Sequence, residues 1–224
     1  MSKEVKVTKA LLSKVRYDTD LSKTALVTVD VQVGFGEGFE PVPHAHAAVE
    51  NIRRACQAWR AAGGTVIHIH TYYTPDKGPD GRMEDFVPGL AEGLAKDAPA
   101  TAFYDGLVSP GDILVRKTAF SAVMSSDLVE QLRRRGFDTA VVCGLTTPIC
   151  VQTTVDGLSQ TGTKVILLAD GCASQPMGNV SAEDAHDMAV TRMAYLFAEV
   201  TTTADFIARA AVEPREQRIR AAAE

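Results

Sequence analysis

The chain has 224 residues, a formal net charge of −5 and a pI near 5.6, and 46% of its residues are hydrophobic. This balance is that of an ordinary globular protein, and it argues against nucleic acid as the main partner because phosphate binding needs a clustered basic face. No stretch approaches the roughly 20 apolar residues of a membrane span, and the amino-terminal segment lacks a signal-peptide core. We therefore expect a cytoplasmic protein with no membrane partner.

Short apolar runs rich in β-branched residues alternate with helix-like segments along the chain. The runs predict strands at 24–30, 64–70, 112–117, 138–143, 164–169 and 199–203. Apolar side chains at helical spacing predict helices at 45–62, 126–135, 148–160 and 181–197. Near-continuous apolar strands are typical of a parallel sheet covered on both faces. The alternation predicts one domain over 1–224, with its core at about 20–207. Its fold is expected to be a three-layer α/β/α sandwich around a mostly parallel, six-stranded Rossmann-like sheet.

Three further segments carry local signals. Ser181 precedes the helix at 181–197, and an acid at the third position after it, Asp184, makes a capping box. Residues 71–111 form the longest irregular stretch, and a loop region of this length in a compact domain is often functional. The polar, Ala-rich segment 215–224 is expected to be a frayed or docked helix.

Three reactive residues fall at one edge of the predicted sheet. Asp30 ends the first strand, Lys117 ends the third, and Cys150 lies in the first turn of the helix after the fourth. Ligands of open parallel sheets bind beyond the carboxyl ends of the strands. The three side chains are therefore expected to meet. Asp30 could take a thiol proton or be an ordinary strand-end acid, and Lys117 could pair with Asp30 or be solvated.

Cys150 follows the sequence GLTTPI, in which Thr147 can cap a helix and Pro148 fits its first turn. Unpaired N–H groups at a helix start attract anions, so we expect a lowered thiol pKa and a reactive thiolate. The same groups could hold a developing oxyanion. The alternative is a buried structural cysteine, which is the commoner fate of a free thiol.

The remaining cysteines and the histidines are weaker candidates. Cys56 and Cys143 are expected in the core, and Cys172 at the rim of the pocket. A zinc or iron site would need more ligands at suitable spacing than the histidines near the second strand supply, so no metal and no cofactor are predicted.

Three motifs in this order resemble the isochorismatase-like cysteine hydrolase superfamily: LVTVDVQ at 26–32, RKTAFS at 116–121 and CGLTTPICVQTTVD at 143–156. The resemblance covers about residues 20–207 and implies a catalytic triad of Asp30, Lys117 and Cys150. It also implies a cis peptide bond between Leu145 and Thr146, and an oxyanion hole made by the N–H groups of Thr146 and Cys150. Family members are usually homodimers or homotetramers in which a neighbouring subunit often closes the pocket.

Departures from known branches narrow the expected reaction. Nicotinamidases of this superfamily carry an Asp-x-His metal motif after the second strand, whereas residues 71–78 here read TYYTPDKG. The full triad favours an amidase similar to maleamate or N-carbamoylsarcosine amidohydrolases. Such an enzyme would cleave the C–N bond of a small linear amide or ureido compound through a thioester and release ammonia or an amine. The alternatives are an isochorismatase-type vinyl-ether hydrolase, which needs the aspartate more than the thiol, a nicotinamidase that lacks the usual metal motif, and a non-catalytic scaffold protein.

Side chains near the triad in this scheme could contact the small-molecule substrate. The polar contact would be Gln32, and the aromatic walls would be Phe35, Tyr72, Tyr73, Phe86 and Phe120. A substrate carboxylate could be bound by any of four basic residues, between which spacing does not choose: Lys77, Arg82, Arg116 and Arg192.

Overall fold

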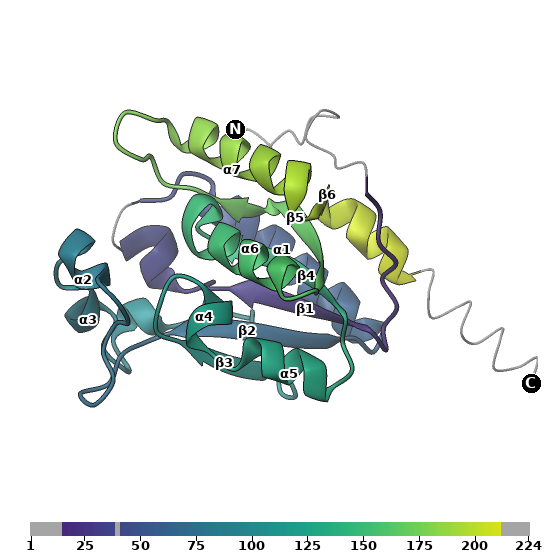
Figure 1. Ribbon diagram of the computed structural model, residues 1–224, viewed down its shortest axis with the longest axis horizontal. Coiled ribbons are helices and arrows are strands. Elements are labelled where there is room, and N and C mark those ends of the chain that lie inside the picture. The colour runs from purple at the N-terminus through teal and green to yellow at the C-terminus, as the bar shows by residue number, and fades with distance from the viewer. Residues whose placement is uncertain (1–14, 39–40, 212–224) are drawn as a thin grey trace, which may run out of the picture.

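Six parallel strands form one sheet in the computed structural model, which describes residues 15–38 and 41–211. Their order is β3-β2-β1-β4-β5-β6 (Figure 1). The strands are β1 (Thr24–Val29), β2 (Thr65–Thr71), β3 (Ile113–Lys117), β4 (Thr139–Leu145), β5 (Lys164–Ala173) and β6 (Glu199–Thr201). The predicted six-stranded parallel sheet is therefore confirmed, while the helix expected at 215–224 lies outside the described residues.

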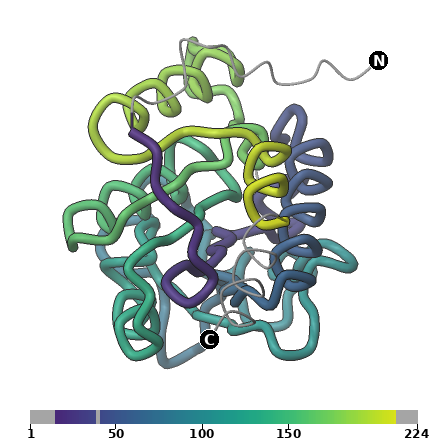
Figure 2. Tube along the Cα trace, turned by 90° about the vertical axis from the view of Figure 1, so that its right-hand side faces the viewer, coloured from purple at the N-terminus to yellow at the C-terminus, as the bar shows by residue number. Residues whose placement is uncertain are grey.

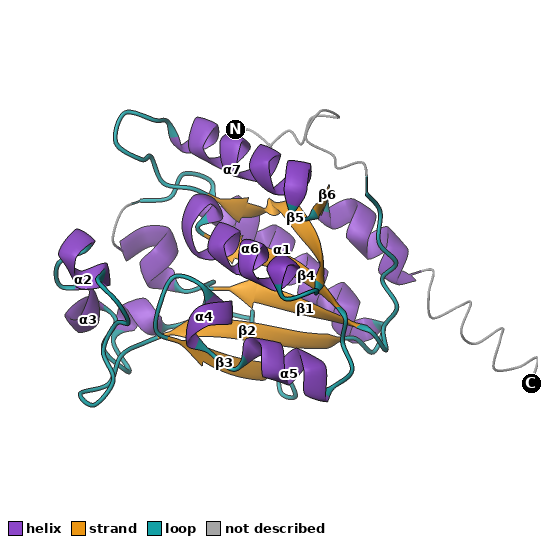
Figure 3. Ribbon diagram, in the orientation of Figure 1, coloured by secondary structure: helices purple, strands orange, loops and turns teal. Residues whose placement is uncertain are grey.

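Helices cover both faces of the sheet (Figure 3). The longer ones are α1 (Ala45–Ala61), α5 (Leu128–Arg134), α6 (Gln152–Gln160), α7 (Ala182–Leu196) and an additional helix at 203–211. Seen along the layers, α1 and the helix at 203–211 lie side by side on one face, and α5, α6 and α7 lie on the other (Figure 2). Trp59 and Phe206 join the first pair, with ring centroids 5.2 Å apart. The three-layer sandwich is confirmed. Ser181 caps α7, since its hydroxyl accepts from the Asp184 N–H at 3.0 Å, but the Asp184 carboxylate bonds this hydroxyl at 2.8 Å and not the backbone N–H of a full capping box.

The middle of the sheet is its most buried part and sets the position of the site. Every residue of β1 and β4 is buried, as expected for apolar strands between two helical layers. The chain connections change direction between these two neighbours, and the crevice at such a switch point is where open sheets bind ligands. Gly144 has φ 139°, and a Cβ there would lie 2.1 Å from the Val29 carbonyl oxygen. Only glycine fits this close approach of β4 to β1.

The stretch 71–111 is more ordered than the sequence indicates. It contains three short helical segments, α2 (Met83–Phe86), α3 (Leu90–Gly93) and η2 (Pro99–Thr101). Four buried side chains from it form a separate apolar cluster, which we call the second cluster: Tyr73, Met83, Leu90 and Leu94. The prediction of an irregular loop was wrong here, because helices of four residues or fewer leave no periodic signal in a sequence.

The cysteines not at the sheet edge are buried. Cys56 and Cys143 lie in the core, as predicted. The placement of Cys172 at the pocket rim was wrong, because the residue is 0% exposed and its thiol lies 3.4 Å from the Leu168 carbonyl oxygen. β5 continues to Ala173, four residues beyond the predicted strand, and so carries Cys172 into the core.

A chain of polar side chains crosses the core between β1, β2 and α1. The Thr28 hydroxyl lies 2.7 Å from His68 Nδ1, and His68 Nε2 lies 3.0 Å from the Asp112 carboxylate. Arg60 donates to both oxygens of Asp112, at 3.0 and 2.6 Å. These partners suit a neutral His68 that accepts from Thr28 and donates to Asp112.

No described helix is both long and apolar enough to cross a bilayer.

Burial of histidines makes the fold sensitive to acid. Burial lowers the pKa of His68, His70 and His186 from the ordinary value of 6.5. Below pH 6.5 the unfolded chain therefore binds more protons than the folded one, and the free energy of unfolding falls until the folded pKa values are reached. We expect urea unfolding to show a loss of about 1 kcal/mol or more between pH 7.5 and pH 5. A free energy of unfolding that stays constant or rises on acidification would contradict this assignment.

Candidate active site

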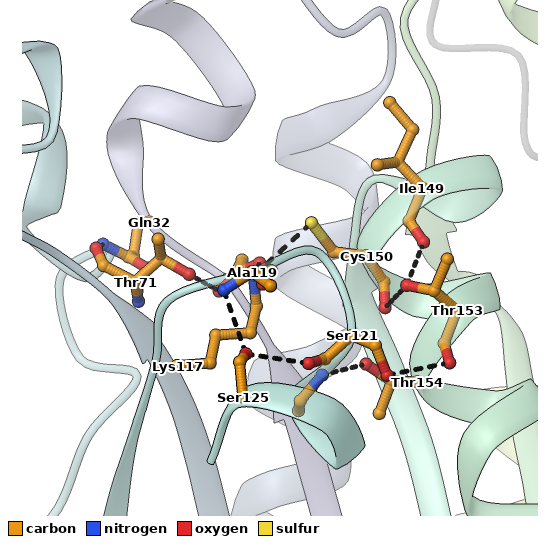
Figure 4. Close-up of polar contacts among 12 residues, drawn as sticks. Gln32, Thr71, Lys117, Ala119, Ser121, Ser125, Ile149, Cys150, Thr153 and Thr154 are labelled. Carbon is orange, nitrogen blue, oxygen red and sulfur yellow. Dashed lines mark hydrogen bonds and ion pairs between the residues drawn. The ribbon is translucent and has the colours of Figure 1, made fainter. Parts of the chain in front are cut away.

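Asp30, Lys117 and Cys150 meet at the carboxyl end of the sheet. Figure 4 shows Lys117 and Cys150 at this meeting point. Lys117 Nζ lies 2.7 Å from Asp30 Oδ2 and 3.6 Å from Cys150 Sγ. The long lysine side chain reaches past the end of β2, which separates β3 from β1. The meeting of the three side chains is therefore as the sequence predicts.

Asp30 is held in place from two sides. It directly follows β1 and has φ 49°, a left-handed conformation that aspartate tolerates better than most residues. The Thr71 hydroxyl, at the end of β2, donates to Asp30 Oδ1 at 2.7 Å. Asp30 is 0% exposed, so its charge is neutralised by Lys117 rather than by water.

Lys117 is surrounded by three acceptors, which matches the three protons of an ammonium group. Besides Asp30 and Cys150, it donates to the Ala119 carbonyl oxygen at 2.9 Å. Burial acts to lower the pKa of Lys117, but the Asp30 carboxylate and the Cys150 sulfur outweigh it and raise that pKa. The side chain is 1% exposed and stays charged.

The environment of Cys150 differs from the one expected. The residue lies in η3 (Thr147–Val151), a wide helical turn before α6, and is 4% exposed. Burial raises the pKa of the thiol to about 12, against the lowering effect of Lys117. The expectation of a resting thiolate was wrong, because desolvation exceeds what the helix start and Lys117 contribute. The thiol is within hydrogen-bond reach of Asp30, which can accept its proton.

The turn that holds Cys150 is fixed at both ends. The peptide bond between Leu145 and Thr146 is cis, at the position that the family resemblance implies. The N–H groups of Ile149 and Val151 donate to the Thr146 carbonyl oxygen, at 3.2 and 3.3 Å. Thr147 does not cap the helix as expected, since its hydroxyl lies 2.8 Å from His186 Nδ1 on α7.

A serine in α4 (Ala122–Ser125) fixes the loop under Lys117 (Figure 4). The Ser125 hydroxyl accepts from the N–H groups of Thr118 and Ala119, at 3.3 and 2.9 Å. It donates to the Ser121 carbonyl at 2.9 Å. Sequence reasoning missed this residue, together with Thr71 and Ala119, because side chains that support a site share no periodicity with it.

Ser125→Ala is expected to lower kcat/KM about tenfold and the free energy of unfolding by about 1–3 kcal/mol, because two N–H groups lose their acceptor. Ser126→Ala is the matched control: the Ser126 hydroxyl donates to Ala122 and accepts from Leu128, outside this loop. Ser126→Ala should lower the free energy of unfolding and leave kcat/KM unchanged. Equal losses of kcat/KM in the two variants would contradict a positioning role for Ser125.

Two of the predicted substrate contacts are bound to other parts of the chain. Gln32 is fully buried, and its amide bonds the backbone of Thr71 and Thr101, so it ties the ends of β1 and β2 together. Tyr72 lies on the opposite side of the chain, where the Arg116 guanidinium stacks 4.5 Å from its ring centroid. Substrate contact by these two residues stays a prediction, and residue type alone did not show the bonds that they make within the chain.

The other aromatic candidates divide into two groups. Phe35 and Phe120 are half-buried and pack against both the main core and the second cluster, which contains Tyr73. These three remain suited to line a pocket beside Lys117. Phe86, in contrast, is 83% exposed on α2. Among the described residues, no group of three or more histidine, cysteine or acidic side chains is arranged to hold a metal ion.

The chain is similar to known hydrolases over most of its length. The family model of the isochorismatase domain matches residues 24–205. A ureidoacrylate amidohydrolase of Azorhizobium caulinodans is 32% identical in an alignment that covers 88% of this chain and 94% of that protein.

Solved structures agree with the sequence comparison. A cysteine hydrolase from Pseudomonas syringae pv. phaseolicola superposes with a TM-score of 0.82 at 33% identity, over 90% of this chain and 97% of that one. An N-carbamoylsarcosine amidase from Thermoplasma acidophilum superposes with a TM-score of 0.67 at 25% identity, over 81% of this chain and 96% of that one. With the fold, the order of strands and the extent of the match in agreement, the chain belongs to the isochorismatase domain family.

Proposed function

We propose that the protein is a cysteine amidohydrolase that cleaves the C–N bond of a small linear amide or ureido compound. The observation that carries the proposal is the contact of Lys117 with both Asp30 and Cys150 in a buried position at the sheet edge. A carboxylate, a cation and a thiol in contact supply a base, a charge stabiliser and a nucleophile. Relatives named as ureidoacrylate and N-carbamoylsarcosine amide hydrolases support the same class of reaction.

The first half of the reaction forms a thioester. Asp30 accepts the proton of Cys150 while Sγ bonds to the carbonyl carbon and the carbonyl electrons move to oxygen. Because the thiol pKa is raised to about 12, proton transfer accompanies attack rather than preceding it. The tetrahedral intermediate re-forms its carbonyl as the C–N bond breaks, and Asp30 returns the proton to the leaving nitrogen.

The second half regenerates the enzyme. Water attacks the thioester carbon and gives a proton to Asp30, the C–S bond breaks, and the sulfur recovers the proton. Lys117 stays charged and offsets the negative charge that passes between Asp30 and Cys150. The balance is one water consumed and one ammonia or amine released for each acid formed.

The oxyanion is proposed to lie against the N–H groups of Thr146 and Cys150. Thr146 directly precedes η3 and Cys150 lies within it, where the first N–H groups of a helical turn have no partner inside the turn. The neighbouring N–H groups of Ile149 and Val151 bond the Thr146 carbonyl, so the turn is rigid around the sulfur. Rigid donors of this kind need little reorganisation when charge develops.

The test is release of ammonia from a panel of small primary amides and ureido compounds. The full chain should release ammonia from at least one of them, and a thioester should accumulate on Cys150 when the reaction is quenched in acid and examined by mass spectrometry. Release without a Cys150 adduct, unaffected by loss of the thiol, would instead favour a mechanism without a nucleophilic cysteine.

We also propose that the protein assembles as a homodimer or homotetramer. Large apolar side chains on α2, α4 and α7 are more than 65% exposed: Phe86, Met124, Met188, Tyr195 and Leu196. Large exposed apolar side chains of this kind are ones that an interface between copies of the chain would cover. Sedimentation velocity at micromolar concentration should give twice or four times the 24.0 kDa monomer mass, and a monomer would contradict the proposal.

A further inference from the structure

We infer that this site takes an uncharged amide and that the Tyr73 hydroxyl donates a hydrogen bond to an oxygen of that substrate. The inference rests on the proposed function. It adds that the substrate is uncharged and that Tyr73 binds it. It joins two observations: a buried hydroxyl beside the triad without a partner among the described residues, and four candidate basic side chains that each have another partner.

The Tyr73 ring is directed to the side of the chain that carries the triad. Tyr73 follows Thr71 by two residues in an extended segment, and residues two apart share a side. The Thr71 hydroxyl contacts Asp30, while the intervening Tyr72 stacks on Arg116 on the other side. Burial and the nearby Asp30 carboxylate raise the pKa of the Tyr73 hydroxyl, which agrees with a position facing the triad.

The position of Tyr73 is fixed by its surroundings. Its N–H donates to Leu94 at 2.8 Å, and its carbonyl accepts from Lys96 at 2.7 Å. The ring lies in the second cluster, which also contacts Ala119 and Phe120 beside Lys117. A ring held in this way presents its hydroxyl in one place and loses little freedom when a ligand binds.

The Tyr73 hydroxyl has no hydrogen-bond partner among the described residues, although the side chain is only 2% exposed. Nearly all buried polar groups are paired, and an unpaired one in a folded protein calls for an explanation. The unpaired Tyr73 hydroxyl is explained if it donates a hydrogen bond to an oxygen of the bound substrate. Phenylalanine would fill the same space without an unpaired hydroxyl.

The four basic residues considered for a substrate carboxylate are all bound to other groups. Lys77 pairs with Asp80, and Arg82 pairs with Asp85. Both of these cations are exposed.

The other two candidate residues, Arg116 and Arg192, also have partners within the chain. Arg116 stacks on Tyr72 and donates to the carbonyl oxygens of Tyr72 and Lys77, each at 3.1 Å. Arg192 lies 2.7 Å from the Asp156 carboxylate. With the three acceptors around Lys117, each of these five cations already has a partner within the chain.

The charges at the site itself also disfavour an anion. Asp30 and Lys117 cancel, and the Cys150 thiol is neutral at rest, so the triad has no net charge. The nearest further charges acting on Tyr73 are those of Glu84 and Asp80, which are negative. A carboxylate that left water for this position would lose its hydration without gaining a cation. A neutral carbonyl or ester oxygen would gain the Tyr73 hydroxyl.

The first test compares matched substrates that differ only in charge. Maleamate and 3-ureidopropionate are each compared with their methyl esters, and only ammonia is measured, so ester cleavage does not count. We expect kcat/KM for the esters to exceed that for the acids at least tenfold. Higher kcat/KM for the acids would overturn the inference and leave the proposed function intact, whereas no ammonia from any amide would contradict the proposed function as well.

The second test reads the charge preference without turnover. Cys150 is alkylated with neutral iodoacetamide and with anionic iodoacetate at low salt, and the adduct is located by mass spectrometry; the other three cysteines are fully buried. The ratio of the two rates, divided by the same ratio for glutathione, should be at least ten. A normalised ratio of one or less would overturn the charge preference, whatever the amide assays give.

The third test addresses the hydroxyl. Tyr73→Phe should lower kcat/KM for the methyl esters about tenfold and leave the thermal midpoint unchanged or raised, because the lost hydroxyl has no partner in the protein. Tyr72→Phe is the matched control and should change neither value. Unchanged kcat/KM in Tyr73→Phe, or a lowered midpoint that reveals a structural bond, would overturn the role of Tyr73.

Discussion

Cys150→Ala is expected to lower kcat for ammonia release by at least about a thousandfold, because covalent catalysis ends when the nucleophile is removed. Asp30→Asn should have an effect of similar size, since it removes the group that accepts the thiol proton. The loss should be measured as steady-state ammonia release with an excess of the best amide of the panel. The free energy of unfolding should change little in Cys150→Ala, so a loss of activity would not reflect unfolding.

The same pair of variants separates the two reaction classes that the fold permits. A vinyl-ether hydrolase needs the aspartate more than the thiol, so Cys150→Ala would keep much of its activity while Asp30→Asn lost it. Equal loss in the two variants supports the thioester route. Substantial amide hydrolysis by Cys150→Ala would exclude it.

Lys117→Met is expected to lower the free energy of unfolding by about 3–5 kcal/mol, because it leaves the Asp30 carboxylate buried without its cation. Urea unfolding followed by circular dichroism would measure the loss. Adding Asp30→Asn should restore most of the stability, since a neutral amide in the same place can still bond the Thr71 hydroxyl.

Activity should not follow stability in this series. The double variant is expected to be folded and inactive, which would show that the ion pair is kept for chemistry and not for folding. If Lys117→Met were as stable as the parent protein, Lys117 would not be the group that stabilises the buried Asp30 carboxylate, as the mechanism requires. That result would contradict the proposed mechanism directly.

The strands of the parallel sheet and the positions of the main helices could be predicted from the sequence because periodicity and apolar runs are local signals. The meeting of Asp30, Lys117 and Cys150 followed from a rule about sheet edges and needed no side-chain coordinates. Strand ends were predicted less accurately than strand positions. β5 is longer at its carboxyl end than predicted, so Cys172 lies in the core and not at the rim.

Properties that depend on three-dimensional surroundings could not be predicted. The direction of the Cys150 pKa shift depends on how much water the fold removes from the sulfur, and a helix start in the sequence does not show this. The roles of Gln32 and Tyr72 depend on which side of the chain each occupies. The bonds of Ser125 to the loop below Lys117 join residues that no motif connects.

The polar chain of Thr28, His68 and Asp112 has a wider meaning for how hydrolases are recognised. A hydroxyl, an imidazole and a carboxylate in this sequence of contacts are the same three groups that serine-type hydrolases use. Here Thr28 and His68 are sealed inside the sheet, and Arg60 holds the acid from the far side. A phosphonate or sulfonyl fluoride reagent would have no path to Thr28. The molecule thus contains two groups of side chains that resemble a hydrolytic centre: Asp30, Lys117 and Cys150, and Thr28, His68 and Asp112. Access for a substrate, and not the identity of the side chains, distinguishes the first group from the second.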